Sequence, residues 1–256
     1  MAKKDLKKKE ETGLAVPSYI DQGSRTGLEK MRDQDVVYPR IVLLQALSPI
    51  VREKDSPYNA GDMINSVTLE LICERDTQRE FIPILFWPEW IEWGPRSEGG
   101  GVIGMSRDPM SELAQRAKAN EKRDVGGKTV MAVTEYLTFL ILLADRPPVT
   151  MADAVCLSCA KSNYKHGKRL LNLARLRGNV PLFAGKYTLS AASEHNARSN
   201  SDYWAYGLEN AGFASEEQYA FAKEAYELLK DHEVKAAEMR SETEDSESAG
   251  DTSSIT

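Results

Sequence analysis

Lysine and arginine side chains crowd into one stretch of the chain that contains no aspartate or glutamate. The segment 161–187 carries seven of them, and no acid occurs among the 40 residues between Asp153 and Glu194. The whole chain is acidic, with 39 Asp and Glu against 33 Lys and Arg. At that frequency, a window of this length would hold about six acids. Crowded cations without acids are typical of a surface that binds phosphate groups, so the segment predicts contact with a polyanion.

The cations recur at helical spacing. At 3.6 residues per turn, one stripe contains Lys161, Lys165, Lys168, Asn172 and Arg175, with Arg169 beside it, while Leu170, Leu173 and Ala174 fall on the opposite side. A solvated helix face is the common alternative. Such a face usually mixes both signs, because like charges three or four residues apart repel each other. The residues expected to hold phosphates are therefore Lys161, Lys165, Lys168, Arg169 and Arg175, with Arg177 and Lys186 extending the track.

Aromatic residues lie in and after the basic segment. Rings beside a cationic track can stack on unpaired bases, each stack contributing about 1–3 kcal/mol. Burial in the core is the commoner explanation for any one such ring. The predicted stacking residues are Tyr164, Tyr187, Trp204 and Tyr206, and Arg198 adds a further cation. A second aromatic set, Trp87, Trp90 and Trp93, lies beside Glu89 and Glu92, whose charges would repel phosphate, so we expect it in the core or on a partner surface.

Patterns that would indicate nucleotide binding are incomplete. Gly99, Gly101 and Gly104 match G-x-G-x-x-G, but a polar turn precedes them and the next helix is expected only near Asp108. No helix N-terminus would then meet a pyrophosphate, so we expect a mobile loop. The tripeptide 127–129 resembles the end of a phosphate-binding loop, yet a strand is expected after it instead of a helix.

Metal binding and catalysis lack a complete set of residues. Cys156 and Cys159 resemble half of a zinc site, but no other cysteine or histidine has the paired spacing, so buried apolar positions are expected. Asp62, Glu70 and Glu80 could converge on a metal ion, although carboxylates on the outer face of a hairpin are mostly solvated. We expect no cofactor, no metal and no enzyme activity. A metal-dependent nuclease or other DNA-processing enzyme is the least favoured alternative.

The chain divides into a central domain and two polar ends. Residues 1–35 are polar, and residues 241–256 hold five acids and no base, so both ends are expected to be disordered. The most apolar run, 136–144, has nine residues, whereas a membrane span needs about twenty, so no membrane partner is expected. Three cysteines without an export signal predict a reducing cytoplasm. Residues 36–240 are expected to form a single α+β nucleic-acid-binding domain.

Alternation of apolar residues and turn signals predict the elements of this domain. Strands are expected over 63–73, 80–87, 129–143, 149–157, 183–190 and 203–208. A helix over 109–122 would have Asp108 as N-cap and Pro109 at its first position. The basic helix would end at Gly178, and a last helix to about residue 240 would open with a capping box of Ser215 and Gln218.

A family resemblance is carried by three blocks: GLEKMRDQDVVYPRIVLLQALSPIV, GDMINSV and FIPILFWPEWIEWGPR. They resemble a group of tailed-bacteriophage proteins generally encoded among DNA-metabolism genes, and the similarity runs from about Gly27 to Leu229. The group is similar in plan to phage single-stranded DNA-binding proteins. That resemblance implies an antiparallel β-barrel or strongly curved sheet of the oligonucleotide-binding kind, with an acidic tail that engages phage or host replication proteins. The chain departs from it in ending on Ile255-Thr256 instead of an aromatic residue, and in its added helices.

The residues and the resemblance together predict a bacteriophage protein that binds single-stranded DNA without catalysis. We expect it to act in DNA replication or recombination in the cytoplasm of the infected bacterial host. The acidic tail is expected to occupy the basic face when DNA is absent and to bind partners once displaced, and a tail that only keeps the protein in solution is the alternative. The alternative from another class is a virion or assembly protein that binds an acidic protein partner. The sequence leaves a homodimer open.

Overall fold

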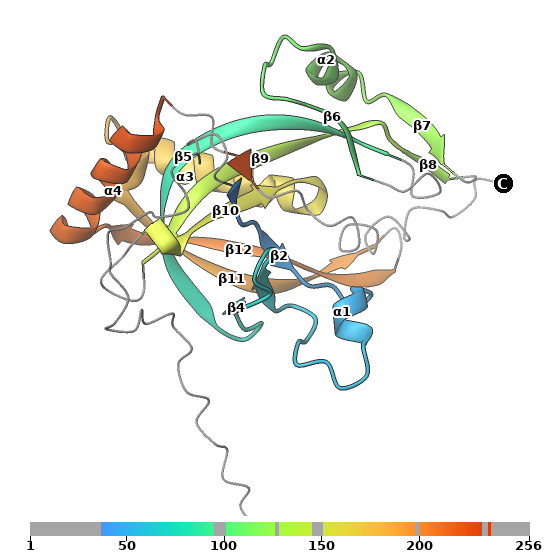
Figure 1. Cartoon of the computed structure of the whole chain (residues 1–256), viewed down its shortest axis with the longest axis horizontal. Coiled ribbons are helices and arrows are strands. Elements are labelled where there is room, and N and C mark those ends of the chain that lie inside the picture. The colour runs from blue at the N-terminus through green and yellow to red at the C-terminus, as the bar shows by residue number, and fades with distance from the viewer. Residues whose placement is uncertain are drawn as a thin grey trace, which may run out of the picture.

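The structure is a computed structural model that describes residues 37–94, 101–125, 128–144, 151–197, 200–231 and 235–236. Within these residues, a six-stranded antiparallel sheet forms the centre of the molecule (Figure 1). Its strands follow the order β10-β9-β5-β11-β12, and β6 also pairs with β5. The bounds are β5 Gln78–Trp93, β6 Val102–Ser106, β9 Val133–Leu143, β10 Ala154–Cys159, β11 Gly185–Asn196 and β12 Ser201–Phe213.

The long strand β5 changes partner along one of its edges. Its first residues, up to Phe81, pair with β11, and its last residues, from Trp90 onward, pair with β6. Pro83 and Pro88 lie between these two pairings, and a proline has no N–H to donate to a neighbouring strand. β9 pairs along most of the other edge. The change of partner accompanies the long arc through which β5 bends (Figure 1).

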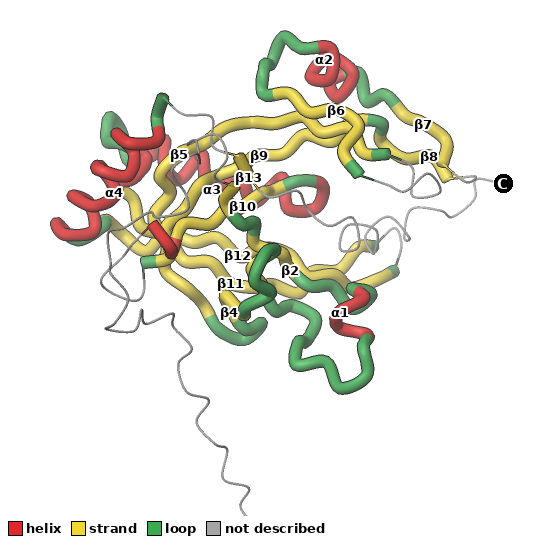
Figure 2. The backbone as a smooth tube through the Cα atoms, viewed as in Figure 1, coloured by secondary structure: helices red, strands yellow, loops and turns green. Residues whose placement is uncertain are grey.

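The central sheet is curved but open. No backbone pairing among the described residues joins β10 to β12, so these strands do not close into a barrel. The backbone trace shows the curvature of the sheet, with the helices lying outside it (Figure 2). The predicted α+β class with antiparallel strands is therefore confirmed, and of the two predicted sheet forms the described strands show the curved sheet.

Both faces of the sheet are buried along most of β9. Leu137, Phe139 and Ile141 enter one core, whereas Leu140 and Leu142 enter another, because successive side chains of a strand point to opposite faces. Burial on both faces explains why residues 136–144 form a continuous apolar run. None of the helices in the described part of the chain has the length and apolar character that crossing a membrane requires.

Different elements cover the two faces. The first core is shared with α3 (Tyr164–Leu176) and with a small sheet of β2 (Ile41–Leu43), β3 (Met63–Asn65) and β4 (Leu71–Cys73). The second core is shared with α4 (Glu216–Leu229). The basic helix and the last helix therefore lie on opposite faces of the central sheet.

A smaller unit packs on the far ends of β5 and β9. There α2 (Glu112–Lys118) buries Ala114 against Trp90. The guanidinium of Arg116 donates two hydrogen bonds of 2.8 Å to Glu92 and so fixes α2 to β5. The other elements are α1 Pro49–Arg52, β1 Val37–Tyr38, β7 Lys122–Val125, β8 Lys128–Met131, β13 Lys235–Ala236 and the short 3-10 helices Met151–Asp153, Lys161–Asn163 and Leu182–Ala184.

Several predicted strands have different bounds. The stretch 63–73 is a hairpin of β3 and β4, because the Asn65 side chain accepts backbone hydrogen bonds from Val67 and Thr68 and turns the chain. The predicted strand 129–143 is interrupted at Ala132 between β8 and β9. β5, β11 and β12 are all longer than predicted, and the last part of the predicted loop at 99–104 belongs to β6.

The helix ends are partly as predicted. The capping box of Ser215 and Gln218 is confirmed, and α3 ends before Gly178, which adopts a positive φ of 80°. The cap of α2 is Ser111 and not Asp108, and α4 ends at Leu229, well short of residue 240. The predicted arm 1–35 and tail 241–256, together with Gly99, lie outside the described residues.

Gly167 allows α3 to approach the sheet closely. A Cβ atom at this position would lie 2.8 Å from Cβ of Cys159 and 3.1 Å from Cδ1 of Leu137. Gly167→Ala is therefore expected to lower the free energy of unfolding by about 1–3 kcal/mol, as overpacked cores do, although alanine is the better helix former. Chemical denaturation measures the change. The control, Asn172→Ala on the exposed side of α3, should be neutral or slightly stabilising, and a similar result for both variants would contradict the close contact.

Candidate nucleic-acid interface

One side of α3 is fixed to the rest of the fold. Leu170 is buried in the first core, and Leu171 and Leu173 pack partly against it. Just before the helix, the Asn163 side chain accepts a hydrogen bond of 2.8 Å from the backbone N–H of Tyr206 and ties the start of α3 to β12. The opposite side of the helix is left to solvent.

The solvent-facing side carries the predicted cations. The exposed residues of this side are Lys165, Lys168, Arg169, Asn172 and Arg175. Lys161 is also exposed and lies before α3 in a short 3-10 helix, with a positive φ of 49°. The helical phase predicted from the 3.6-residue period is therefore confirmed for the residues of α3. Lys161, predicted on the same helical stripe, precedes α3 and does not share its helical geometry.

The charges of α3 do not follow the pattern that stabilises a helix by itself. Acids in the first turn and cations in the last turn complement the helix dipole. The first turn of α4 carries Glu216 and Glu217, whereas the first turn of α3 has no acid and includes Lys165. Arg175, in the last turn, does suit the dipole. Stabilisation of the helix by its dipole therefore accounts for Arg175 but not for the positions of the other cations of α3.

Glu194 on β11 reaches the stripe and neutralises Lys165. The Lys165 ammonium donates to its carboxylate at 2.5 Å, the Tyr203 hydroxyl donates at 2.5 Å, and His166 Nε2 lies 3.1 Å from its other oxygen. Burial raises the pKa of Glu194, but the hydrogen bonds from Lys165 and Tyr203 outweigh burial and hold this pKa below its ordinary value. Lys165 is therefore already paired, by an acid just beyond the acid-free window.

The two cations predicted to extend the track are engaged within the fold. Lys186 forms an ion pair of 2.9 Å with Glu80 on β5. The Arg177 guanidinium lies 4.6 Å from the centre of the Tyr187 ring and 4.9 Å from that of Phe213, and it donates to the Lys186 carbonyl at 3.2 Å. The track of phosphate contacts is therefore not extended by Arg177 and Lys186 as predicted, because their charged groups already have partners within the fold.

Two of the predicted stacking rings are buried. Tyr187 is fully buried, and Tyr206 is 4% exposed and donates its hydroxyl hydrogen bond to the Ile41 carbonyl at 3.1 Å. Both rings fill the first core, so their prediction as stacking surfaces is wrong. Tyr164 and Trp204 are half-buried, and the Lys168 ammonium lies 4.7 Å from the centre of the Tyr164 ring.

A smaller set of cations remains available on this surface. No ion pair joins Lys161, Lys168, Arg169 or Arg175 to an acid within the described residues. These four residues are called the cationic face below. Arg198, also predicted as a contact, lies outside the described residues.

A buried ion pair, missed by the sequence reasoning, joins Arg40 to Glu89. The guanidinium donates to the carboxylate at 2.7 Å, and the Glu89 side chain is fully buried. The Thr138 hydroxyl and the Trp87 indole also donate to Glu89, at 2.8 and 3.2 Å, while Arg40 donates to the Ser158 hydroxyl. Burial raises the pKa of Glu89, but the charge of Arg40 and these hydrogen bonds outweigh it and lower the pKa. The cluster therefore stabilises the fold and is closed to ligands.

One signal in the sequence could have indicated this pair. Arg40 and Glu89 are each a lone charge within an apolar run, YPRIVLL and ILFWPEW, and their signs are opposite. Buried charges are normally paired. Trp87 and Trp90 are buried as predicted, but Glu89 points into the fold and does not present its charge to phosphate.

The candidate metal ligands do not come together. Cys156 lies in the second core and Cys159 in the first, and burial raises the pKa of both free thiols to about 12. The Asp62 carboxylate accepts backbone hydrogen bonds of 2.7 and 3.0 Å, Glu70 is exposed and Glu80 pairs with a lysine. Over the described ranges, no three His, Cys, Asp or Glu side chains are placed to hold a metal ion.

One protein-family model matches the chain, and the matched residues include the surface described above. A family model described as Pam3 phage gp34-like protein matches residues 8–235 of the chain. A search of curated proteins finds no match. The matched stretch includes α3 and the whole cationic face.

Proposed function

Since the chain belongs to the Pam3 phage gp34-like protein family, a family of phage proteins, we propose that it binds single-stranded DNA without catalysing a reaction. The proposed setting is DNA replication or recombination in the cytoplasm of the infected bacterial host. The family supports the phage setting, and the cationic face supports the binding activity. The acidic tail, residues 241–256, is proposed to engage phage or host replication proteins.

The cationic face is the observation that carries this proposal. Lys161, Lys168, Arg169 and Arg175 are exposed and are not neutralised by acids of the described chain. Holding like charges together without compensation destabilises a helix, and binding to phosphates would remove that repulsion. Each phosphate that they neutralise on a single strand is expected to add about −0.7 to the slope of log affinity against log salt.

The aromatic contribution to this surface is smaller than the sequence predicted. Tyr164 lies beside Lys168, and Trp204 is half-buried. Only the exposed part of each half-buried ring can stack on a base. Most of the affinity is therefore expected to come from phosphate contacts, with little sequence preference. We propose that the curved antiparallel sheet that supports α3 is the part of this protein that resembles oligonucleotide-binding proteins.

Binding can be tested directly with the full-length chain. Fluorescence anisotropy would compare a labelled single strand with a duplex and an RNA of the same length, with and without magnesium or manganese. The proposal predicts tightest binding to the single-stranded DNA, steep weakening with salt and an intact strand after incubation. Preferential binding to the duplex, no binding at low salt, or metal-dependent cleavage of the strand would overturn it.

Apolar residues beside the cations favour a second candidate function. Leu176, Val180 and Phe213 are 82%, 40% and 62% exposed. Exposed apolar side chains next to cations suit an acidic protein partner, as a virion or assembly protein would require. Purified phage particles would retain such a protein, whereas a replication protein would be abundant only in the lysate of infected cells.

Removing the charge of Glu194 is expected to strengthen DNA binding, because Lys165 is then free to contact a phosphate. For Glu194→Gln we expect affinity for a single strand to rise about five- to tenfold at low salt and the salt slope to steepen by about 0.7. Anisotropy titrations at several salt concentrations measure both changes. The control is Glu209→Gln, which removes an exposed acid on β12. Equal gains for both variants would show that only net charge matters and would contradict a role for Lys165.

A further inference from the structure

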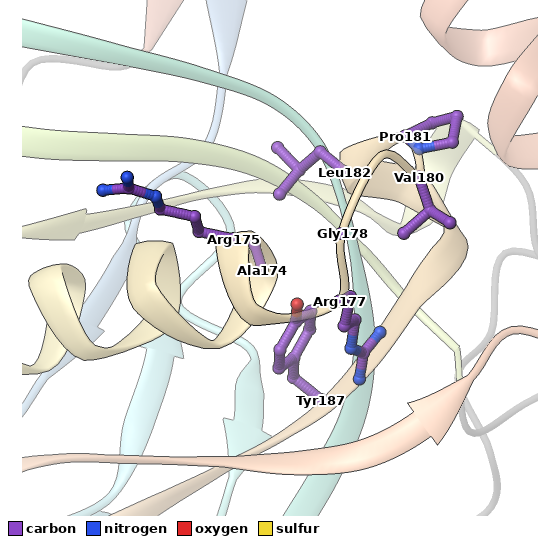
Figure 3. A pocket seen from close by; sticks show the side chains of 8 residues that line it. All are labelled: Ala174, Arg175, Arg177, Gly178, Val180, Pro181, Leu182 and Tyr187. Carbon is purple, nitrogen blue, oxygen red and sulfur yellow. The ribbon is translucent and has the colours of Figure 1, made fainter.

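A pocket of about 210 Å³ lies at the C-terminal end of α3. The end of the helix, the loop that follows it and β11 surround the pocket (Figure 3). Ala174, Val180, Pro181 and Leu182 give it apolar walls. Arg175 lies at the rim, and its side chain extends away from the pocket and back along the helix (Figure 3). The pocket therefore adjoins the cationic face.

The floor of the pocket is Tyr187. Its side chain is fully buried, its hydroxyl points toward the end of α3 (Figure 3), and this hydroxyl has no hydrogen-bond partner among the described residues. A buried hydroxyl without a partner destabilises a fold, and in a native structure such a group calls for an explanation, for example a functional role or a bound water or ion. Burial raises the pKa of Tyr187, with the charge of Arg177 opposing the rise. The hydroxyl is therefore protonated at neutral pH and can both donate and accept a hydrogen bond.

Neighbouring residues hold the Tyr187 ring in place. The Arg177 guanidinium lies against the ring, 4.6 Å from its centre, and Phe81 packs beside it with ring centres 5.8 Å apart. A Cβ atom on Gly185 would meet the Arg177 guanidinium at far less than contact distance, so the guanidinium lies directly against this glycine. Arg177 therefore acts as a positioning residue for Tyr187 and not as a phosphate contact.

The size and lining of the pocket fit one aromatic heterocycle. An apolar cavity of about 150 Å³ can hold a benzene ring, so a pocket of about 210 Å³ has room for a pyrimidine ring. The apolar walls would contact such a ring, and a small shift of the lining residues would bring the buried Tyr187 hydroxyl to a polar group on the edge of the ring. A phosphate would leave the apolar walls without a match. Among the parts of a nucleic acid, the base is the one that suits both features.

The position of Arg175 links the pocket to the proposed DNA path. A strand whose phosphates lie along the cationic face would pass Arg175 and bring the attached base beside the pocket. We propose that the pocket receives one unpaired base of the bound strand, an inference that rests on the proposed function. In a duplex this base would be paired and stacked, so the pocket would favour single strands.

The test compares a strand that carries bases with one that carries none. The full-length protein would be titrated with an oligothymidine of about 16 nucleotides and with an abasic sugar-phosphate strand of the same length. The wild type is expected to bind the oligothymidine about tenfold more tightly. Tyr187→Phe removes only the hydroxyl, and Ala174→Leu fills the pocket. Both variants should reduce the ratio of the affinity for oligothymidine to the affinity for the abasic strand toward one, while the affinity for the abasic strand itself stays unchanged.

Controls separate this inference from the proposed function. Tyr219→Phe changes a tyrosine of α4 in the second core and should keep the wild-type ratio. Thermal unfolding confirms that each variant is folded, and Tyr187→Phe should be at least as stable as the wild type because its hydroxyl has no partner to lose. Equal binding of both strands by the wild type, or an unchanged ratio in both pocket variants, would overturn the base pocket alone. Failure to bind either strand would overturn the proposed function together with it.

Discussion

Replacing Lys168, Arg169 and Arg175 with glutamate is expected to reduce the affinity for single-stranded DNA by about a hundredfold or more at low salt. The three side chains lie on the exposed side of α3 and form no ion pair with a described acid. Their loss removes three phosphate contacts, and the new carboxylates would repel the strand. The salt slope should also become shallower by about 2, which anisotropy titrations at several salt concentrations would measure.

A matched variant controls for the change in net charge. Arg52, Lys54 and Lys223 are exposed and lie outside α3, in or just after α1 and in α4. Replacing all three with glutamate changes the net charge by the same amount as the first triple variant. This control is expected to lose no more than about threefold in affinity, since a distant exposed charge is largely screened. If the two triple variants lost affinity equally, binding would not depend on the cationic face.

Replacing Arg40 with methionine is expected to lower the free energy of unfolding by about 3–5 kcal/mol. Glu89 is fully buried, and removing Arg40 leaves its charge without the principal partner. Removing one member of a buried ion pair typically has an effect of about this size. Chemical denaturation monitored by tryptophan fluorescence would measure it.

Two further variants sharpen this test. Arg75→Met breaks an exposed pair with Asp76, in which the two side chains are 46% and 82% exposed, and should change stability by less than about 1 kcal/mol. The double variant Arg40→Met/Glu89→Met should be more stable than Arg40→Met, because it leaves no unpaired buried charge. A double variant that is less stable than the single variant would contradict this explanation.

The pH dependence of stability should differ between wild type and Arg40→Met. In the wild type the pKa of Glu89 lies below its ordinary value of 4.5. The pair therefore contributes stability above that value and loses it as pH falls through the lowered pKa. Without Arg40, burial is expected to raise the pKa of Glu89, so the folded state takes up a proton. The variant should then gain stability as pH falls toward 4.5, whereas the wild type should not.

Local signals in the sequence predicted local structure well. The capping box at Ser215, the stop at Gly178 and the exposed phase of Lys165, Lys168 and Arg175 all depend on residues within a few positions of each other. The apolar run at 136–144 likewise indicated a buried segment. Such features follow from backbone geometry and side-chain period, which a single sequence contains.

Contacts between distant residues were not predictable in the same way. Glu194 is 29 residues from Lys165, and Glu89 is 49 residues from Arg40. Their pairing depends on strand order and register, because a shift of one residue would turn each side chain to the other face. The burial of Tyr187 and Tyr206 cannot be predicted for the same reason, since it depends on which elements cover the sheet. The surface that remains available for binding phosphates is narrower than the predicted surface and is centred on α3.

The salt dependence of single-strand binding tests the central claim most directly. For the wild type, the cationic face of four residues predicts a plot of log affinity against log salt with a slope of about −3, and a slope near −1 after the triple glutamate change. A flat plot for the wild type, or the same slope in both proteins, would contradict the assignment of phosphate binding to α3.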